Sequence, residues 1–146
     1  MDYQNAFAIS SAGMNVERLR VEISALNLAN ANTVAEADGT VFQALRVVAR
    51  ATTTTPDQAM PFATLVDRGL AGPVASVEAA QLPARRVLEP GHPMADAQGF
   101  VRYAAVDTTT EMLTIMRATR AYEANIAAMN AAKTMAMRAL DIGSGS

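Results

Sequence analysis

Hydrophobic positions recur at alternating spacings of three and four near both ends of the chain. The N-terminal stripe consists of Ile9, Ala12, Val16, Leu19, Ile23, Leu26 and Asn30. The C-terminal stripe consists of Met112, Ile115, Thr119, Tyr122, Ile126, Met129, Lys133, Ala136 and Leu140. This spacing places each set on one side of an α-helix and is typical of coiled coils. We therefore expect two helices whose apolar stripes are buried against a helix of the same chain or of a neighbour.

The N-terminal helix is expected from about Asn5 to Ala31, because the asparagines that follow can bond the local backbone and end a helix. Gly13 lies inside this helix, and either a close helix–helix approach or simple tolerance explains it. Asn27 and Asn30 lie on or beside the stripe. A buried asparagine there can fix register, and for Asn30 a helix-ending role is an equal alternative.

The C-terminal helix has a start signal, since Thr108 and Glu111 have the spacing of a capping box. The helical pattern continues from there to Ile142, with Gly143 as the expected C-cap. Methionines are frequent along it, at positions 112, 116, 129, 135 and 137. We interpret them as adaptable packing against irregular partner surfaces rather than as a ligand-binding cluster.

The middle of the chain is rich in β-branched residues and is interrupted by prolines and glycines. Strands are predicted at 41–55, 65–66, 74–77, 87–88 and 100–103, with turns at 36–39 and 89–93. The expected fold is mainly α, with long N- and C-terminal helices forming a coiled coil and a small β-rich insert between them. The expected segments are 1–35 and 107–142 for the helices, 36–106 for the insert and 143–146 for a flexible tail.

The composition narrows the function further. The chain has 146 residues, of which 51% are hydrophobic and 18% charged, and its net charge of −2 gives no electrostatic reason to bind nucleic acid. It contains no cysteine, which excludes disulfides, thiol catalysis and thiolate metal sites. The first residues lack the positive charge of a secretory signal, and no segment reaches the roughly 20 apolar residues of a membrane span.

Candidate chemistry is sparse. His92 is the only histidine, and it lies in a proline-rich turn with no second histidine or cysteine to share a metal ion. The carboxylates are scattered, the serines lack a nucleophile-elbow context, and no glycine-rich phosphate loop is present. We therefore expect no catalytic, cofactor-binding or metal-binding residue and no small-molecule substrate. A small hydrolase that uses His92 is the enzyme alternative.

Three groups of residues carry a resemblance to a known family. Residues 24–33, SALNLANANT, resemble the N-terminal signature of flagellar rod and hook proteins. Residues 120–125, RAYEAN, followed by Ala132, Lys133 and Met135, resemble their C-terminal signature. Residues 90–93, PGHP, followed by the GFV of 99–101 and the EM of 111–112, are similar to the proximal-rod subfamily, FlgC.

The resemblance implies a structural subunit of the proximal rod of the bacterial flagellar basal body, and hence a role in cell motility. It implies helical assembly that transmits torque and lines the export channel, with coiled-coil terminal helices inside and the insert outside. It also implies type III export without a cleaved signal and a location in the rod, which crosses the periplasm. The implied partners are further copies, other proximal and distal rod subunits, rod–membrane-ring junction proteins and the export apparatus.

The predicted assembly contacts combine both stripes with the two signature motifs. They are Leu19, Ile23, Leu26, Asn27, Asn30, Tyr122, Asn125, Ile126 and Met129. Two non-enzymatic alternatives remain open. One is another flagellar rod subunit, and the other is a cytoplasmic coiled-coil adaptor or oligomerisation module.

Overall fold

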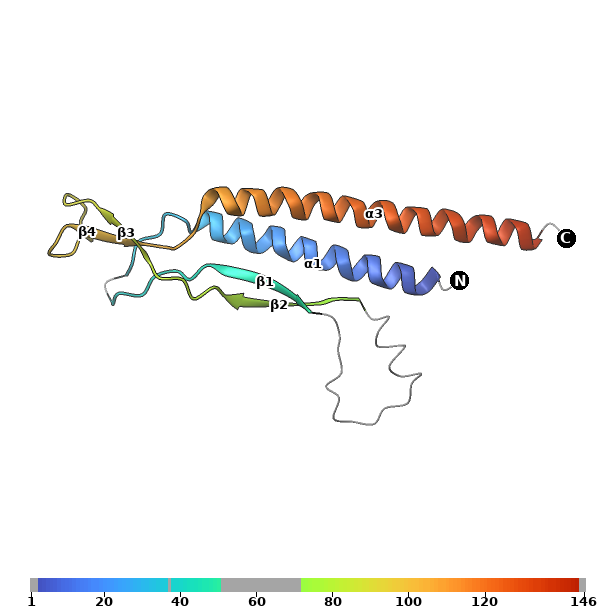
Figure 1. The fold of residues 1–146 in the computed structure, drawn as a ribbon, viewed down its shortest axis with the longest axis horizontal. Helices are drawn as coiled ribbons and strands as arrows, with labels where there is room; N and C mark the ends of the chain where they lie inside the picture. The colour runs from blue at the N-terminus through green and yellow to red at the C-terminus, as the bar shows by residue number, and fades with distance from the viewer. Residues whose placement is uncertain (1–2, 37, 51–71, 145–146) are drawn as a thin grey trace, which may run out of the picture. The chain divides into compact units, whose positions relative to one another are not determined.

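A computed structural model describes residues 3–36, 38–50 and 72–144. Helix α1 spans Tyr3–Ala29 and helix α3 spans Thr108–Ser144, and the strands between them are β1 (Leu45–Arg50), β2 (Val74–Ala79), β3 (Arg85–Leu88) and β4 (Phe100–Tyr103) (Figure 1). The expected arrangement of two long helices with a small β-rich insert between them is confirmed.

The described residues form two compact units. The first unit takes its residues from 1–19, 48–76 and 118–146, and the second takes them from 20–47 and 77–117. Both helices and the β1–β2 pair contribute to each unit. Each unit therefore contains its own stretch of α1, of α3 and of the insert.

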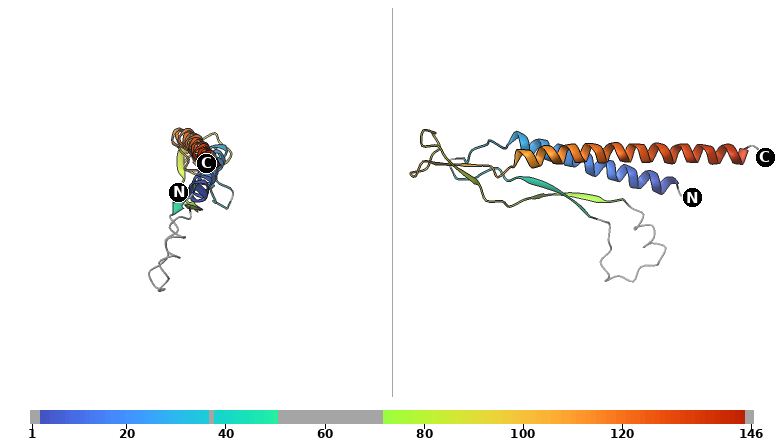
Figure 2. Two further views of the ribbon diagram at one scale, coloured as in Figure 1. Left: turned by 90° about the vertical axis from the view of Figure 1, so that its right-hand side faces the viewer. Right: turned by 45° about the horizontal axis from the view of Figure 1, so that its top comes forward.

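In each unit α1 and α3 lie side by side (Figures 1 and 2). In the first unit Gly13 faces Asn125, because a Cβ on Gly13 would lie 3.0 Å from the side-chain amide. In the second unit the Asn27 amide donates a hydrogen bond of 2.9 Å to Glu111. Gly13 precedes Asn27, whereas Asn125 follows Glu111, so the two helices run antiparallel. Of the two explanations for Gly13, the structure supports the close helix–helix approach.

The sides of the helices that face each other do not coincide with the predicted apolar stripes. The buried residues of α1 are Ser10, Val16, Ser24 and Asn27, and of these only Val16 belongs to the stripe. The buried residues of α3 are Ala118 and Ala132, which lie one position before stripe residues. Small side chains allow the two backbones to approach closely, whereas large apolar ones would hold them apart. Burial of the apolar stripes within the chain is therefore partial, and their burial against a neighbouring chain stays a prediction.

The helix ends differ from the predicted ones by small shifts. Helix α1 begins and ends about two residues earlier than predicted, within the usual uncertainty of helix ends. Helix α3 continues through Ser144, so Gly143 is not its C-cap, and residues 143 and 144 belong to the helix rather than to a flexible tail. Residues 145–146 lie outside the described residues.

The predicted capping box at the start of α3 is wrong. The N-cap is Asp107, whose carboxylate accepts hydrogen bonds from the Thr109 backbone N–H, at 3.2 Å, and from the Thr110 hydroxyl. A carboxylate at the N-cap also interacts favourably with the helix dipole, so Asp107 takes the position that was assigned to Thr108. Glu111, the predicted box partner, instead turns toward Asn27.

The insert consists of two small sheets. Strands β3 and β4 pair antiparallel, from Arg85 opposite Tyr103 to Leu88 opposite Phe100. The strands predicted at 87–88 and 100–103 are thus confirmed. Strands β1 and β2 form the second sheet, where Arg46 and Glu78 approach to 3.4 Å. β2 confirms the strand predicted at 74–77. Of the strand predicted at 41–55, only Leu45–Arg50 forms a strand within the described residues. The strand predicted at 65–66 lies outside the described residues.

A small core in the second unit joins the insert to the end of α1. Its buried residues are Ala31, Ala44, Ala104 and Val106, and Val41, Phe42 and Ala80 pack around them. The turn predicted at 36–39 closes beside it, where the Gly39 N–H donates to the Glu36 carbonyl at 2.8 Å and Gly39 adopts a φ of 85°. Glycine adopts such a φ without steric cost, which explains its presence there.

Candidate assembly interface

Asn27 is a buried polar residue of the second unit whose side chain makes three hydrogen bonds. It is 1% exposed, and its amide donates to the Leu45 carbonyl at 2.7 Å and to the Glu111 carboxylate at 2.9 Å. Its side-chain oxygen accepts the Leu45 N–H at 2.9 Å. The side chain thus pairs with the backbone of β1 as a neighbouring strand would, while it also contacts α3. We refer to Asn27, Leu45 and Glu111 as the Asn27 cluster.

The Asn27 cluster lies beside a cavity of about 160 Å³. Apolar side chains of Ile23, Leu45 and Val47 line part of it, and the polar residues Arg20, Ser24, Arg46, Glu111 and Thr114 line the rest. No buried side-chain nitrogen or oxygen of the described residues lacks a hydrogen-bond partner. The buried polar atoms of the cluster are therefore paired within the chain.

The other N-terminal residues predicted to make assembly contacts are half-buried or exposed. Leu19 and Ile23 are half-buried, and Leu26 is 42% exposed. Asn30 is half-buried, and its amide donates to the Leu26 carbonyl at 2.9 Å. That local bond supports the helix-ending role of Asn30. Of the five predicted N-terminal contacts, Asn27 is the one whose side chain is already enclosed within the chain.

The predicted contacts of α3 fall into two groups. Asn125 bonds its own helix, at 3.0 Å from the Ala121 carbonyl, and faces Gly13. Tyr122 and Met129 are half-buried, and Ile126 is 39% exposed. The structure thus places Asn125 against α1 and leaves Ile126 largely on the surface.

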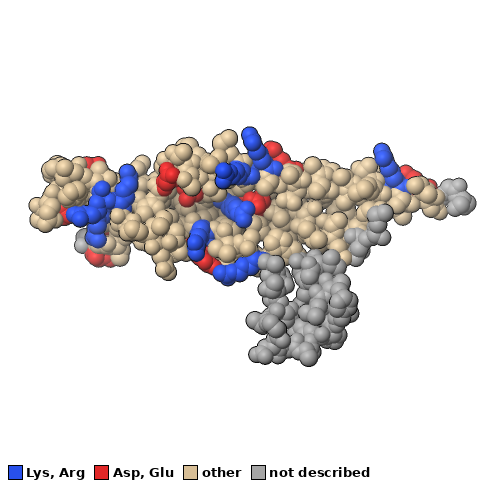
Figure 3. Space-filling view, viewed as in Figure 1, with Lys and Arg blue, Asp and Glu red and all other residues tan. Residues whose placement is uncertain are grey.

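Large apolar side chains cover much of the outer surface of α3. The exposed ones are Met112, Leu113, Met116, Ile126, Met135, Met137, Leu140 and Ile142, and the last two are 74% and 81% exposed. Charged residues are few on this helix, and Figure 3 shows mostly uncharged surface in that region. We call these eight residues the apolar face of α3. Leu113 and Ile142 were not identified from the sequence because they lie off the heptad positions.

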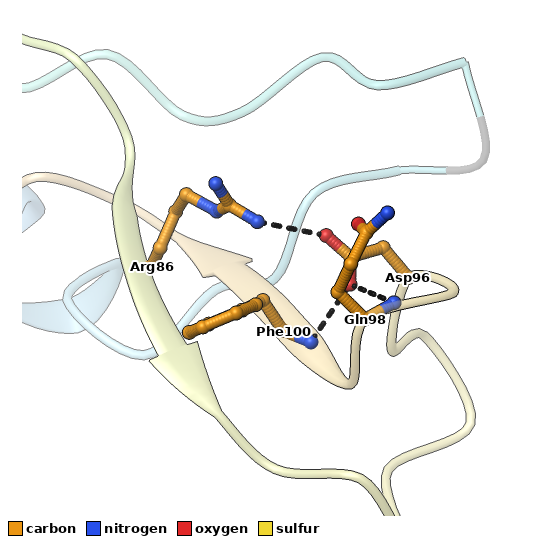
Figure 4. Close-up of polar contacts among 4 residues, drawn as sticks. All are labelled: Arg86, Asp96, Gln98 and Phe100. Atoms are coloured by element: carbon orange, nitrogen blue, oxygen red, sulfur yellow. Dashed lines mark hydrogen bonds and ion pairs between the residues drawn. The ribbon is translucent and has the colours of Figure 1, made fainter.

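The loop between β3 and β4 is held by Asp96 (Figure 4). Its carboxylate accepts the backbone N–H groups of Phe100, at 2.8 Å, and Gln98, at 3.0 Å, and it pairs with Arg86 at 3.1 Å. The Phe100 bond, followed by the Gln98 bond and the Arg86 charge, lowers the pKa of Asp96. The loop therefore has a defined conformation at neutral pH.

His92 lies in this loop and has a local structural role. Its Nδ1 accepts the Met94 backbone N–H at 3.1 Å. Within residues 3–36, 38–50 and 72–144 no group of three or more potential metal-ligating side chains comes together. None of the helices described here is long and apolar enough to cross a membrane.

Comparison with known proteins first gives the class to which this fold belongs. Residues 97–142, which include β4 and most of α3, match the family described as flagellar basal body rod FlgEFG protein, C-terminal. The long terminal helices and the apolar face of α3 thus occur in a protein of the flagellar rod class.

Relatives over the whole length give the particular family. The chain is 37% identical over 139 residues to the flagellar basal-body rod protein FlgC of Salmonella typhimurium, covering 95% of this chain and 96% of the relative. It is 32% identical over 148 residues to FlgC of Yersinia enterocolitica, covering 98% and 99%, and 31% identical over 144 residues to FlgC of Borreliella burgdorferi, covering 94% and 95%. The chain belongs to the FlgC family of flagellar basal-body rod proteins.

This family membership decides between the alternatives that the sequence left open. FlgC proteins are structural rod proteins and not enzymes, so a hydrolase that uses His92 is excluded. The family also excludes a cytoplasmic adaptor and favours the proximal-rod resemblance over other rod subunits.

Proposed function

We propose that this chain is a structural subunit of the flagellar rod that assembles helically by burying the apolar face of α3 against neighbouring subunits. The observation that carries this proposal is the exposure of eight large apolar side chains on one helix of a small protein. Large apolar surfaces that a folded chain leaves uncovered often mark sites of contact with other proteins. Repeated head-to-tail contacts that do not close into a ring produce a helical assembly.

Coiled-coil packing of the terminal helices is part of the proposal. The heptad spacing of the two apolar stripes supports it, because such a repeat keeps one side of a helix facing a partner along a supercoil. The predicted contacts other than Asn27 and Asn125 then lie beside this pair of helices, where a helix of a neighbouring subunit can pack. They are Leu19, Ile23, Leu26, Asn30, Tyr122, Ile126 and Met129.

In the assembled rod this subunit transmits torque and contributes to the wall of the export channel. The hydrogen-bonded Asn27 cluster supports the first role, because it ties α1, α3 and β1 together at one point. Its partners are further copies, other proximal and distal rod subunits, rod–membrane-ring junction proteins and the export apparatus. It is exported without a cleaved signal and resides in the part of the basal body that crosses the periplasm.

Electron microscopy of basal bodies from a strain that lacks this gene tests the proposal. Basal bodies that end at the membrane ring, restored to full length by the plasmid-borne gene, are the expected result. Complete basal bodies and normal swimming in the deletion strain would overturn it.

Cysteine labelling tests the interface directly, because the chain has no cysteine of its own. We expect Ile126→Cys to react with a maleimide in the purified subunit and to be protected in purified basal bodies. Ala79→Cys, at an exposed position of β2, is expected to react in both. Equal labelling of Ile126→Cys in both states would show that the apolar face stays uncovered.

A further inference from the structure

Two arginines lie directly opposite each other on the β3–β4 hairpin. The strand register pairs Arg86 with Arg102 and Leu88 with Phe100, so these four side chains share one face. Val101, on the other face, is 0% exposed and belongs to the interior. Like charges directly opposite each other disfavour an antiparallel pair, and Asp96 compensates only one of these two charges, that of Arg86.

The two guanidinium groups have different surroundings. Arg86 lies 4.5 Å from the centre of the Phe100 ring and pairs with Asp96 (Figure 4). Arg102 lies against the turn at Gly39, where an added Cβ would meet its Nη2 at 2.8 Å. In the part of the chain that the structure describes, no carboxylate is within ion-pair distance of Arg102. Arg102 thus presents a positive charge that no carboxylate of the described residues compensates.

The surroundings of Arg102 are basic and partly apolar. Figure 3 shows basic side chains gathered over the β3–β4 end of the second unit, although the whole chain has a net charge of −2. Leu88, on the same face, is 60% exposed. The face therefore combines a free guanidinium with an apolar side chain. We call Arg86, Leu88, Phe100 and Arg102 the arginine face.

We propose that the arginine face binds an acidic segment of a partner protein, with a carboxylate on Arg102 and an apolar side chain on Leu88. The planar guanidinium matches a carboxylate in a two-point hydrogen-bonded pair. An incoming negative charge also offsets the repulsion between Arg86 and Arg102, so binding relieves a cost that the free hairpin carries. This surface is separate from the helix contacts proposed above.

A polypeptide fits this face better than a lipid surface does. Anionic membranes are bound by clusters of about four to eight basic residues, and this face has two arginines. The only lysine of the chain, Lys133, lies on α3 in the other unit. An exposed leucine beside a single free guanidinium matches a peptide in which acidic and apolar residues alternate.

The test uses the purified full chain and two fluorescently labelled, end-capped peptides, Glu-Leu-Glu-Leu-Glu and Gln-Leu-Gln-Leu-Gln. Fluorescence anisotropy should show binding of the acidic peptide, weakened by salt, and no binding of the glutamine peptide. Arg102→Gln should weaken binding by about tenfold, the value of a charge-assisted hydrogen-bonded contact. Arg117→Gln, which removes an exposed arginine of α3 in the same unit, is the matched control and should bind as the wild type does.

Stability distinguishes a binding role of Arg102 from a structural one. Arg102→Gln removes the repulsion with Arg86, so this substitution should leave the Tm of the purified chain unchanged or raise the Tm. A lower Tm would assign Arg102 to the fold and overturn the proposal. Equal weakening of peptide binding by Arg102→Gln and Arg117→Gln would also overturn the proposal. The same holds for stronger binding of the chain to anionic phospholipid vesicles than to the acidic peptide.

Discussion

The Asn27 cluster and the apolar face of α3 use polar and apolar side chains in opposite ways. Asn27 is 1% exposed, and its side chain makes three hydrogen bonds within the chain, whereas Leu140 and Ile142 are 74% and 81% exposed. Contacts between α1 and α3 thus include polar and small side chains, whereas many large apolar side chains of α3 remain on the surface. We therefore expect the fold of one subunit and its assembly with others to depend on different faces of the same helices.

The largest effect is expected from a charge on the apolar face of α3. Ile126→Asp should abolish rod assembly and swimming, because an uncompensated charge buried at each interface costs about 3–5 kcal/mol. The Tm of the purified subunit should fall far less than assembly does, since Ile126 is already 39% exposed there. Swimming assays and electron microscopy of basal bodies measure the first effect, and thermal unfolding measures the second.

The matched control for this variant is Ala79→Asp. It adds the same charge at an exposed position of β2, outside the apolar face of α3. We expect a weaker defect than that of Ile126→Asp. Equal defects in the two variants would mean that the apolar face is not distinguished from the rest of the surface.

Asn27→Ala tests the contribution of the Asn27 cluster to the stability of the fold. It leaves the Leu45 N–H, the Leu45 carbonyl and the Glu111 carboxylate without their partner, and it should reduce the free energy of unfolding by about 3 kcal/mol. Urea unfolding of the purified subunit measures this loss. Asn130→Ala, at an exposed position of α3, should change stability by less than about 0.5 kcal/mol. A loss of similar size in both variants would show that the cluster does not stabilise the fold.

Two glycines of the β3–β4 loop provide a smaller, internally matched test. Gly99 has a φ of 80°, and an added Cβ would lie 3.2 Å from Pro90, whereas a Cβ on Gly91 would meet nothing within 4 Å. Gly99→Ala should therefore cost about 1–2 kcal/mol, and Gly91→Ala should be close to neutral. Differential scanning calorimetry compares the two. If Gly91→Ala proved the more destabilising, the loop conformation described here would be incorrect.

The smallest expected effect is the loss of stability in acid. The Thr110 hydroxyl, followed by the Thr109 N–H, lowers the pKa of Asp107, and the Thr40 N–H lowers the pKa of Asp38. A carboxyl whose pKa is lower in the folded than in the unfolded chain stabilises the fold at neutral pH. That contribution disappears as the pH falls from about 4 through the folded-state pKa. Asp107→Asn should flatten the pH dependence of Tm in this range, and an unchanged slope would contradict the capping role of Asp107.

The sequence predicted the elements of the fold well where the signal was local. The alternating strand pattern at 100–103 and the glycine turn at 36–39 formed as predicted, because local conformational preferences decide them. The start of α3 was placed within one residue, but its cap was assigned to Thr108 instead of Asp107. Both residues are good N-caps, and only the path of the preceding chain decides which one takes the position.

The packing of the two helices was predicted less well. Heptad spacing identifies a stripe of apolar residues, but it does not say which neighbour covers that stripe. The contact between Gly13 and Asn125 requires a close approach that small residues permit, and these residues lie one position away from the apolar stripes. Asn27 was recognised as a polar residue near the stripe, although its bonds to the backbone of β1 depend on a strand 18 residues away.

The sequence by itself determined that two long helices flank a β-rich insert along the chain, and its motifs identified the rod family. Helical periodicity and turn chemistry are local properties, so they are encoded within a few residues of each other. The tertiary structure decided which helix faces meet and that Asn27 joins three elements. It also decided that Arg86 and Arg102 lie opposite each other on the hairpin. These features depend on the register between distant segments, which side-chain size and hydrogen bonding fix only when the chain has folded.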